Sequence, residues 1–165
     1  MTDSGFSEER PTAELTEIVL PNDANILGNI LGGKVMHLID IACAIAAFRH
    51  CRRPVVTASI DSLDFRHPIK VGELIIIKAA LNRAFNTSME IGAKVYSENM
   101  LTGERQHTSS AYLTFVALGE DGNPVRVSEY NPVTKADQRH WKQAEIRRQI
   151  RLKQKEVLRD HENNW

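Results

Sequence analysis

The spacing of hydrophobic residues changes several times along the chain, and each spacing predicts a different element. Residues 34–50 (KVMHLIDIACAIAAFRH) are rich in alanine and apolar around nearly the whole circumference of a helix. The pair Gly32 and Gly33 stands directly before this run. We therefore expect a helix that begins near the glycine pair and is buried on most of its sides.

Extended runs lie on both sides of this helix. Residues 13–20 (AELTEIVL) predict a short strand that ends at Pro21. Residues 55–68 begin with β-branched side chains and then alternate. The side chains of this run that we expect to reach a core are those of Ala58, Ile60 and Leu63 or Phe65. Three longer runs, which predict an antiparallel meander, are residues 73–85, 87–99 and 105–119.

The order of these elements predicts an α+β fold, in which a curved antiparallel sheet wraps around one long helix. We expect one domain over residues 14–128, preceded by a flexible N-terminus at residues 1–13. A chain of 165 residues is the ordinary length for one domain and a tail. Residues 129–165 would form a mostly helical C-terminal extension.

The C-terminal segment, residues 134–165, is highly charged and lacks glycine and proline, which favours a solvated helix. Thr134 and Asp137 have the spacing of a capping box. The apolar stripe is patchy, so we expect the helix to dock at one end and fray at the other. Two interpretations remain: a charged surface helix, or arginines that line the path of an anionic ligand. These arginines are Arg147, Arg148 and Arg151.

The charge balance of the chain argues against nucleic acid and membranes as partners. The 21 Lys and Arg residues balance the 21 Asp and Glu residues, so no strong field attracts nucleic acid or an anionic membrane surface. Two cysteines, no secretory signal and no apolar run of about 20 residues predict a cytoplasmic protein that does not span a membrane. Neither the cysteines nor the histidines have metal-binding spacing, and we expect no metal.

The stretch GNILGGKV, residues 28–35, nearly matches a phosphate-binding loop. Val35 replaces the hydroxyl that would hold magnesium, and no strand leads directly into the loop, which argues against nucleotide hydrolysis. The glycines can have another purpose, because the first amides of a helix have no internal partner and suit a developing oxyanion. Plain packing of a loop against a helix is the alternative.

Asp40 stands in the middle of the apolar helix. A carboxylate there is unfavourable unless it has a partner or a function. It could pair with His37, one turn earlier, or with a backbone amide. It could instead face a pocket as a general base. Cys43 is most simply a small buried apolar residue.

Several of these motifs together resemble one family. The runs PNDANILGNILGGKVMHLIDIACAIAAFRHC, VVTASIDSLDFRHPIKVGE and NTSMEI are similar to the acyl-CoA hydrolase family of hotdog-fold thioesterases. The similarity extends from about Glu14 to Val127. It implies a hotdog fold, dimers formed side by side, commonly three dimers to a hexamer, and active sites between two subunits. The substrate implied is acyl-CoA, with coenzyme A as part of the substrate and no other cofactor.

The resemblance also assigns candidate site residues. Asn25 matches the family's active-site asparagine and Asp40 its catalytic carboxylate, and the two would meet from opposite subunits. Thr57 matches a supporting hydroxyl. Amides at Gly32 and Gly33 would polarise the thioester carbonyl. Candidates for binding the coenzyme A moiety are Arg66, Lys70, Thr87 and Ser88.

Two questions stay open at this point. Asp40 could remove a proton from water or attack the thioester directly to form an anhydride. A non-catalytic protein that senses acyl-CoA would share the fold. The second possibility has less support, because the segment before the first strand is too short and polar for a DNA-binding helix-turn-helix.

Overall fold

The computed structural model describes residues 10–162. Residues 1–9 of the predicted flexible N-terminus lie outside this part, and the division at residues 13 and 128 stays a prediction. The elements follow in the order β1 (Thr12–Ile18), the 3-10 turn η1 (Pro21–Asp23), α1 (Gly32–Cys51), β2 (Val55–Ile60), β3 (Leu74–Ala84), β4 (Ser88–Glu98), β5 (Arg105–Ala117) and α2 (Lys135–Glu162).

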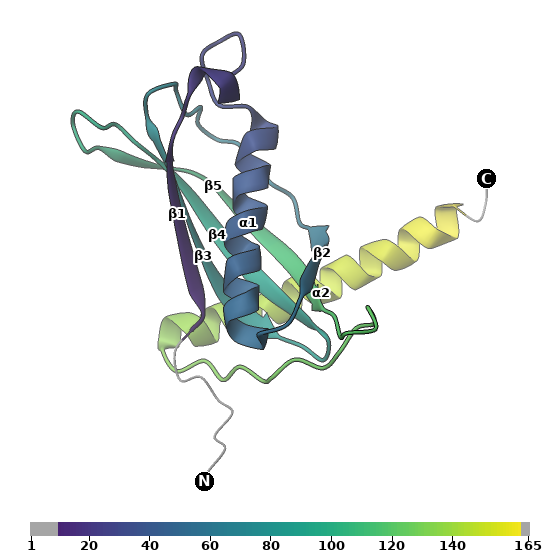
Figure 1. Cartoon of the computed structure of the whole chain (residues 1–165). Helices are drawn as coiled ribbons and strands as arrows, with labels where there is room; N and C mark the ends of the chain where they lie inside the picture. Colours follow the sequence, from purple (N-terminus) through teal and green to yellow (C-terminus); the bar gives the residue numbers. More distant parts are fainter. Residues whose placement is uncertain (1–9, 163–165) are drawn as a thin grey trace.

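The strands form one antiparallel sheet in the order β1-β3-β4-β5-β2. The predicted meander is confirmed as β3, β4 and β5, which are neighbours in both sequence and space. The first strand is also confirmed, although it ends at Ile18, before Pro21, which has no backbone N–H to donate to a ladder. Figure 1 shows α1 across one face of the curved sheet and α2 behind the opposite face. The α+β hotdog prediction is therefore confirmed.

α1 packs on the sheet through one face only, so the expectation of burial on most sides is wrong for the single chain. A sheet from one chain can cover only one side of a helix. Met36, Ile41 and Phe48 remain 41%, 37% and 44% exposed. The side chains of α1 that enter the core are those of Val35, Leu38, Ile39, Ala42, Cys43, Ala46 and Ala47.

The strand after α1 also differs from expectation. β2 stops at Ile60 and forms an edge of the sheet, and its pairing with β5 shifts register between Thr57 and Ser59. This bulge breaks the alternation at Ala58. Ala58 and Ile60 are exposed, contrary to prediction. Of the alternatives Leu63 and Phe65, Leu63 packs against the core and Phe65 is exposed.

Thr134 caps α2 as predicted, but the capping box is only half formed, because the Asp137 carboxylate accepts from the Thr134 hydroxyl and not from its backbone amide. Thr134 donates its hydroxyl to the Asp137 carboxylate at 2.7 Å and accepts the Asp137 amide at 3.1 Å. The first half of α2 crosses the outer face of the sheet, where Ala144 is fully buried, and the second half extends away from it (Figure 1). None of the helices in residues 10–162 is long and apolar enough to cross a membrane.

Candidate active site

The N-terminus of α1 offers hydrogen-bond donors that the fold leaves open. Leu31 occupies the N-cap position and provides no side-chain cap. The amides of Lys34 and Val35 turn back to the Leu31 carbonyl at 3.0 and 3.1 Å. The preceding amides, those of Gly32 and Gly33, have no acceptor inside a helix, and the helix dipole places partial positive charge there. An uncapped N-terminus of this kind suits an oxyanion.

Asn25 lies in a tight loop before α1. Its side-chain oxygen accepts the Leu27 amide at 3.0 Å and the Asn29 amide at 3.2 Å, and its backbone amide bonds to the Asn29 carbonyl at 2.8 Å. Gly28, with φ of 76°, permits the turn. Because the oxygen is engaged by two donors, the orientation of the side-chain amide is fixed. Its Nδ2 group has no partner among the described residues and is available to donate.

Asn25 and Gly32 line one cavity of about 360 Å³. The loop of residues 65–69, the start of α1 and strand β5 enclose it. Phe65 closes over the glycine, since a Cβ at Gly32 would lie 3.4 Å from the Phe65 ring. The remaining lining residues are Asn29, Ile30, Val35, Arg66, His67, Pro68, Ile69, Thr108 and Ser109.

Asp40 has a hydrogen-bond partner outside its own helix. The Thr57 hydroxyl, on β2, donates to Asp40 Oδ1 at 2.6 Å. Asp40 is only partly buried, and His37 is exposed. The pairing with His37 is therefore wrong. One carboxylate oxygen is held by Thr57, and no described residue bonds to the other.

The two groups of residues lie apart within one chain. Asp40 follows Gly32 by eight residues, which at 1.5 Å per residue places it about 12 Å further along the helix axis. Asp40 and Thr57 are also absent from the lining of the cavity that contains Asn25 and Gly32. One chain therefore provides two separate half-sites.

The candidate residues for coenzyme A are also divided. Arg66 lines the cavity beside Asn25, whereas Lys70 lines a different depression, next to Leu101. Thr87 and Ser88 lie at the turn between β3 and β4. Ser88 and Val56, the neighbour of Thr57, both pair with the same residue of β5, Val116. Ser88 therefore lies at the same end of the sheet as Thr57.

The arginines of α2 have structural partners. Arg147 binds the carboxylate of the fully buried Glu90, with Nη2 to Oε1 at 2.6 Å, and Arg151 binds Asp61 at 3.2 Å. Arg148 stacks over a phenylalanine ring, with its Cζ 4.8 Å from the centroid. These contacts do not support the interpretation as an anion path, and α2 is docked by ion pairs instead of lying free on the surface.

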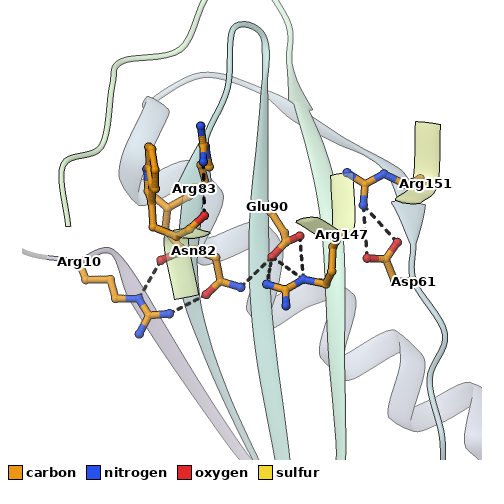
Figure 2. A network of polar contacts seen from close by, with 9 residues as sticks. Arg10, Asp61, Asn82, Arg83, Glu90, Arg147 and Arg151 are labelled. Carbon is orange, nitrogen blue, oxygen red and sulfur yellow. Dashed lines mark hydrogen bonds and ion pairs between the residues drawn. The ribbon is translucent and has the colours of Figure 1, made fainter. Parts of the chain in front are cut away.

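Glu90 belongs to a network that sequence reasoning missed. Figure 2 shows Glu90 between Arg147 and Asn82, and Asn82 in turn beside Arg10. Asn82 donates to Glu90 at 2.9 Å and accepts from Arg10 at 2.6 Å. Asn82 and Glu90 are polar residues among several in β3 and β4, and nothing in the sequence connects them to Arg147.

Other reactive groups in the described residues do not form a site. Burial, and secondarily the charge of Asp40, raises the pKa of Cys43 far above its usual range. This thiol is therefore not a nucleophile at neutral pH. Within residues 10–162, no three His, Cys, Asp or Glu side chains are grouped as metal ligands would be.

Known proteins match this chain over most of its length. The thioesterase superfamily model matches residues 27–104. The uncharacterized acyl-CoA thioester hydrolase YkhA of Bacillus subtilis is 41% identical over 122 residues, which cover 74% of this chain and 71% of YkhA. A crystal structure of an apo-hexameric acyl-CoA thioesterase superimposes with a TM-score of 0.86 and 40% identity, covering 90% of this chain and 96% of that one.

The acyl-CoA hydrolase of Staphylococcus aureus, in complex with butyryl coenzyme A, coenzyme A and coenzyme A disulfide, has a TM-score of 0.80 and 31% identity, covering 90% of this chain and 93% of that one. Three further structures of that hydrolase carry single alanine substitutions, of an asparagine, an aspartate and a threonine. Those three residues are separated by the same two intervals, 15 and 17 residues, as Asn25, Asp40 and Thr57. By fold and by sequence, this chain belongs to the acyl-CoA hydrolase family of hotdog-fold thioesterases.

Proposed function

We propose that this protein hydrolyses acyl-CoA to a free carboxylic acid and coenzyme A, with Asp40 as the general base. The observation that carries the proposal is the Asp40 carboxylate, held on one oxygen by Thr57 in the middle of an apolar helix. The matching intervals in the Staphylococcus aureus hydrolase support the same three residues. The reaction uses water and protein groups, with coenzyme A entering as part of the substrate.

The complete site would form between two subunits. The distance of about 12 Å along α1 separates Asp40 from the amides of its own chain, so one thioester carbon cannot reach both. A symmetric dimer would bring the cavity of one subunit to Asp40 of the other, and it would do so twice. The exposed apolar residues of α1 and the exposed edge of β2 provide a surface for this contact. The similarity to a hexameric thioesterase supports assembly into a trimer of dimers.

The first step is attack by water. Thr57 occupies Oδ1 of Asp40 and fixes the carboxylate, so that Oδ2 can accept a proton from water. The water oxygen forms a bond to the thioester carbon, and the carbonyl electrons move onto oxygen. When the carbon–sulfur bond then breaks, coenzyme A leaves as a thiolate, and the proton on Asp40 is available to it.

The second requirement is stabilisation of the oxyanion. The amide of Gly32 and the Nδ2 group of Asn25 belong to residues that line the same cavity, and with the neighbouring amide of Gly33 they are donors fixed before substrate binds. Such donors favour the transition state because they need no reorganisation as charge develops. In this arrangement Asn25 acts as a donor to the carbonyl oxygen.

Direct attack by Asp40 is the competing route. It would use the same free Oδ2 atom and would leave an anhydride, which water then hydrolyses. A single turnover in ¹⁸O-labelled water tests for the anhydride route. Label in the Asp40 carboxylate would overturn the general-base mechanism, because water oxygen enters that carboxylate only through an anhydride.

The coenzyme A moiety would extend from one half-site to the other. Arg66 carries a charge suited to a phosphate at the rim of the cavity. Thr87 and Ser88 of the second subunit offer hydroxyl and backbone groups at the end of the sheet that carries Thr57. Lys70 lines a separate depression, which leaves it outside this path.

Release of free thiol from a panel of acyl-CoA esters tests the function. Asp40→Asn keeps the shape of the side chain but removes the base, and we expect a loss of about 10²- to 10⁴-fold in kcat. Asp121→Asn makes the same change in an exposed turn and serves as the matched control. Equal, slow release by wild type and Asp40→Asn would contradict the proposal and favour a non-catalytic acyl-CoA sensor.

A further inference from the structure

Ser109 of β5 carries a buried hydroxyl without a partner. Its side chain lines the cavity of about 360 Å³ that contains Asn25 and Gly32, the residue is 1% exposed, and Oγ has no hydrogen bond with any described residue. Its neighbour Thr108, equally buried, donates to the Val95 carbonyl at 3.1 Å. The hydroxyl of Ser109 is thus left open in a place where a ligand would come.

Ser109 faces the inner side of the sheet by the ordinary alternation of β5, together with the buried Ala111, Leu113 and Phe115. The pairing of β4 with β5 shifts register between Val95 and Tyr96, and Thr108, next to Ser109, is therefore also buried. In a regular strand, Thr108 would face the outer side of the sheet. The bulge thus adds Thr108 to the cavity lining as a second polar residue.

The rest of the cavity gives Ser109 no partner. Its buried apolar lining residues are Val35 and Ile69, Ile30 is half-buried, and Phe65 and Pro68 are apolar but exposed. Arg66 and His67 also line it and are exposed. A buried hydroxyl without a hydrogen bond is unfavourable, and native proteins contain few of them. An occupant that brings an oxygen atom into the cavity would remove this penalty.

We propose that the cavity receives the acyl group and that Ser109 selects acyl chains bearing a hydroxyl or keto oxygen. The inference rests on the proposed function, since the donors at Gly32 and Asn25 that would hold the thioester carbonyl open into the same cavity. An acyl chain attached to that carbonyl extends along the apolar lining residues. A substituent oxygen on it can then bond to Ser109, whereas a plain alkyl chain leaves the hydroxyl unpaired. Sites that bond a substrate oxygen discriminate against analogues that lack it.

The test is the ratio of kcat/KM for 3- and 4-hydroxybutyryl-CoA to kcat/KM for butyryl-CoA. In wild type we expect at least one hydroxylated ester to be favoured about tenfold, which corresponds to about 1.4 kcal/mol, the size of one hydrogen bond. Ser109→Ala should bring this ratio close to one. Because both substrates are measured on the same preparation, a misfolded fraction cancels from the ratio.

Thr114→Val is the matched control. Thr114 Oγ1 is the other buried side-chain polar atom without a partner in residues 10–162, but Thr114 does not line this cavity. Its removal should leave the ratio unchanged, as the inference requires.

An unchanged ratio in Ser109→Ala would overturn the inference while leaving the hydrolase function intact. An equal loss of kcat/KM on all substrates would also overturn the inference and leave the hydrolase function intact. It would mean that Ser109 binds a fixed water or the pantetheine common to all of them. If wild type released thiol from none of the esters, both the proposed function and this inference would fail. Loss of the ratio in Thr114→Val as well as Ser109→Ala would also contradict a local role.

Discussion

The ion pair that docks α2 gives a strong prediction about stability. The Glu90 side chain is 0% exposed and that of Arg147 is 19% exposed. Arg147 contacts both carboxylate oxygens through Nε, at 3.1 and 3.2 Å, and Oε1 again through Nη2, at 2.6 Å. Its Cζ atom lies 3.7 Å from the centroid of the Tyr112 ring. Arg147→Met keeps most of the side-chain volume and removes the cation.

The expected loss of stability in Arg147→Met follows from the contacts that Glu90 keeps. After the substitution, Glu90 keeps one hydrogen bond, from Asn82 at 2.9 Å, and its charge is buried without a cation. Removing one partner of a buried pair lowers the free energy of unfolding by about 3–5 kcal/mol. Many domains have only about 5–15 kcal/mol in total. Adding Glu90→Gln removes the stranded charge but keeps an acceptor for Asn82, so the double variant should lose only about 1–2 kcal/mol.

Urea unfolding followed by far-UV circular dichroism measures these differences, at one protein concentration because assembly contributes to stability. Arg148→Met is the matched control: Arg148 stacks on Phe85 at 4.8 Å, and its loss should be below about 1 kcal/mol. A loss below about 1 kcal/mol for Arg147→Met would place the pair among exposed, weak salt bridges and refute the reasoning. A double variant less stable than Arg147→Met alone would refute it too.

Three further results are expected. Thr57→Val should lower kcat in the thiol-release assay about 10- to 100-fold, because a charge-assisted hydrogen bond is lost. Thr57→Ser keeps the hydroxyl and should restore kcat, so an equal loss in both variants would contradict this role. Gly92→Ala would place a Cβ 2.8 Å from the Asn82 amide nitrogen. We expect the free energy of unfolding in urea to fall by about 1–3 kcal/mol, whereas no loss would show that Asn82 is free to move. Burial first, and nearby cations second, lower the pKa of His140. The unfolded chain therefore binds more protons as pH falls through the usual histidine range, and wild type should lose more Tm than His140→Gln between pH 7.5 and 5.5; equal losses would contradict this.

The element order was accessible from the sequence because each element has a strong local signal. Alternation identified the meander, and the alanine-rich apolar run identified α1. Asp40 was recognisable as an exception inside that run. The donors at the start of α1 were also predictable, since the first amides of any helix have no internal partner.

What the sequence did not reveal depends on residues far apart or on a second chain. Glu90 and Arg147 are separated by 57 residues, and no periodicity connects a strand to a helix on the other side of the sheet. The exposure of Ile41 and Ile60 was not predicted, because apolar residues at the surface of one chain follow the same pattern as core residues. The bulge that buries Thr108 beside Ser109 depends on the register between β4 and β5, which the sequence of β5 alone does not specify.

The central claim is that each active site combines Asn25 of one subunit with Asp40 of another. Asn25→Ala and Asp40→Asn should each be nearly inactive, through loss of an oxyanion donor and of the base. Co-expression with two different affinity tags allows assemblies that contain both variants to be purified. In each mixed dimer within them, one of the two symmetric sites has both residues intact, so thiol release should return to as much as about half of the wild-type rate. A mixed dimer as inactive as the two parents would contradict the account, because a site built within one chain is damaged in both subunits.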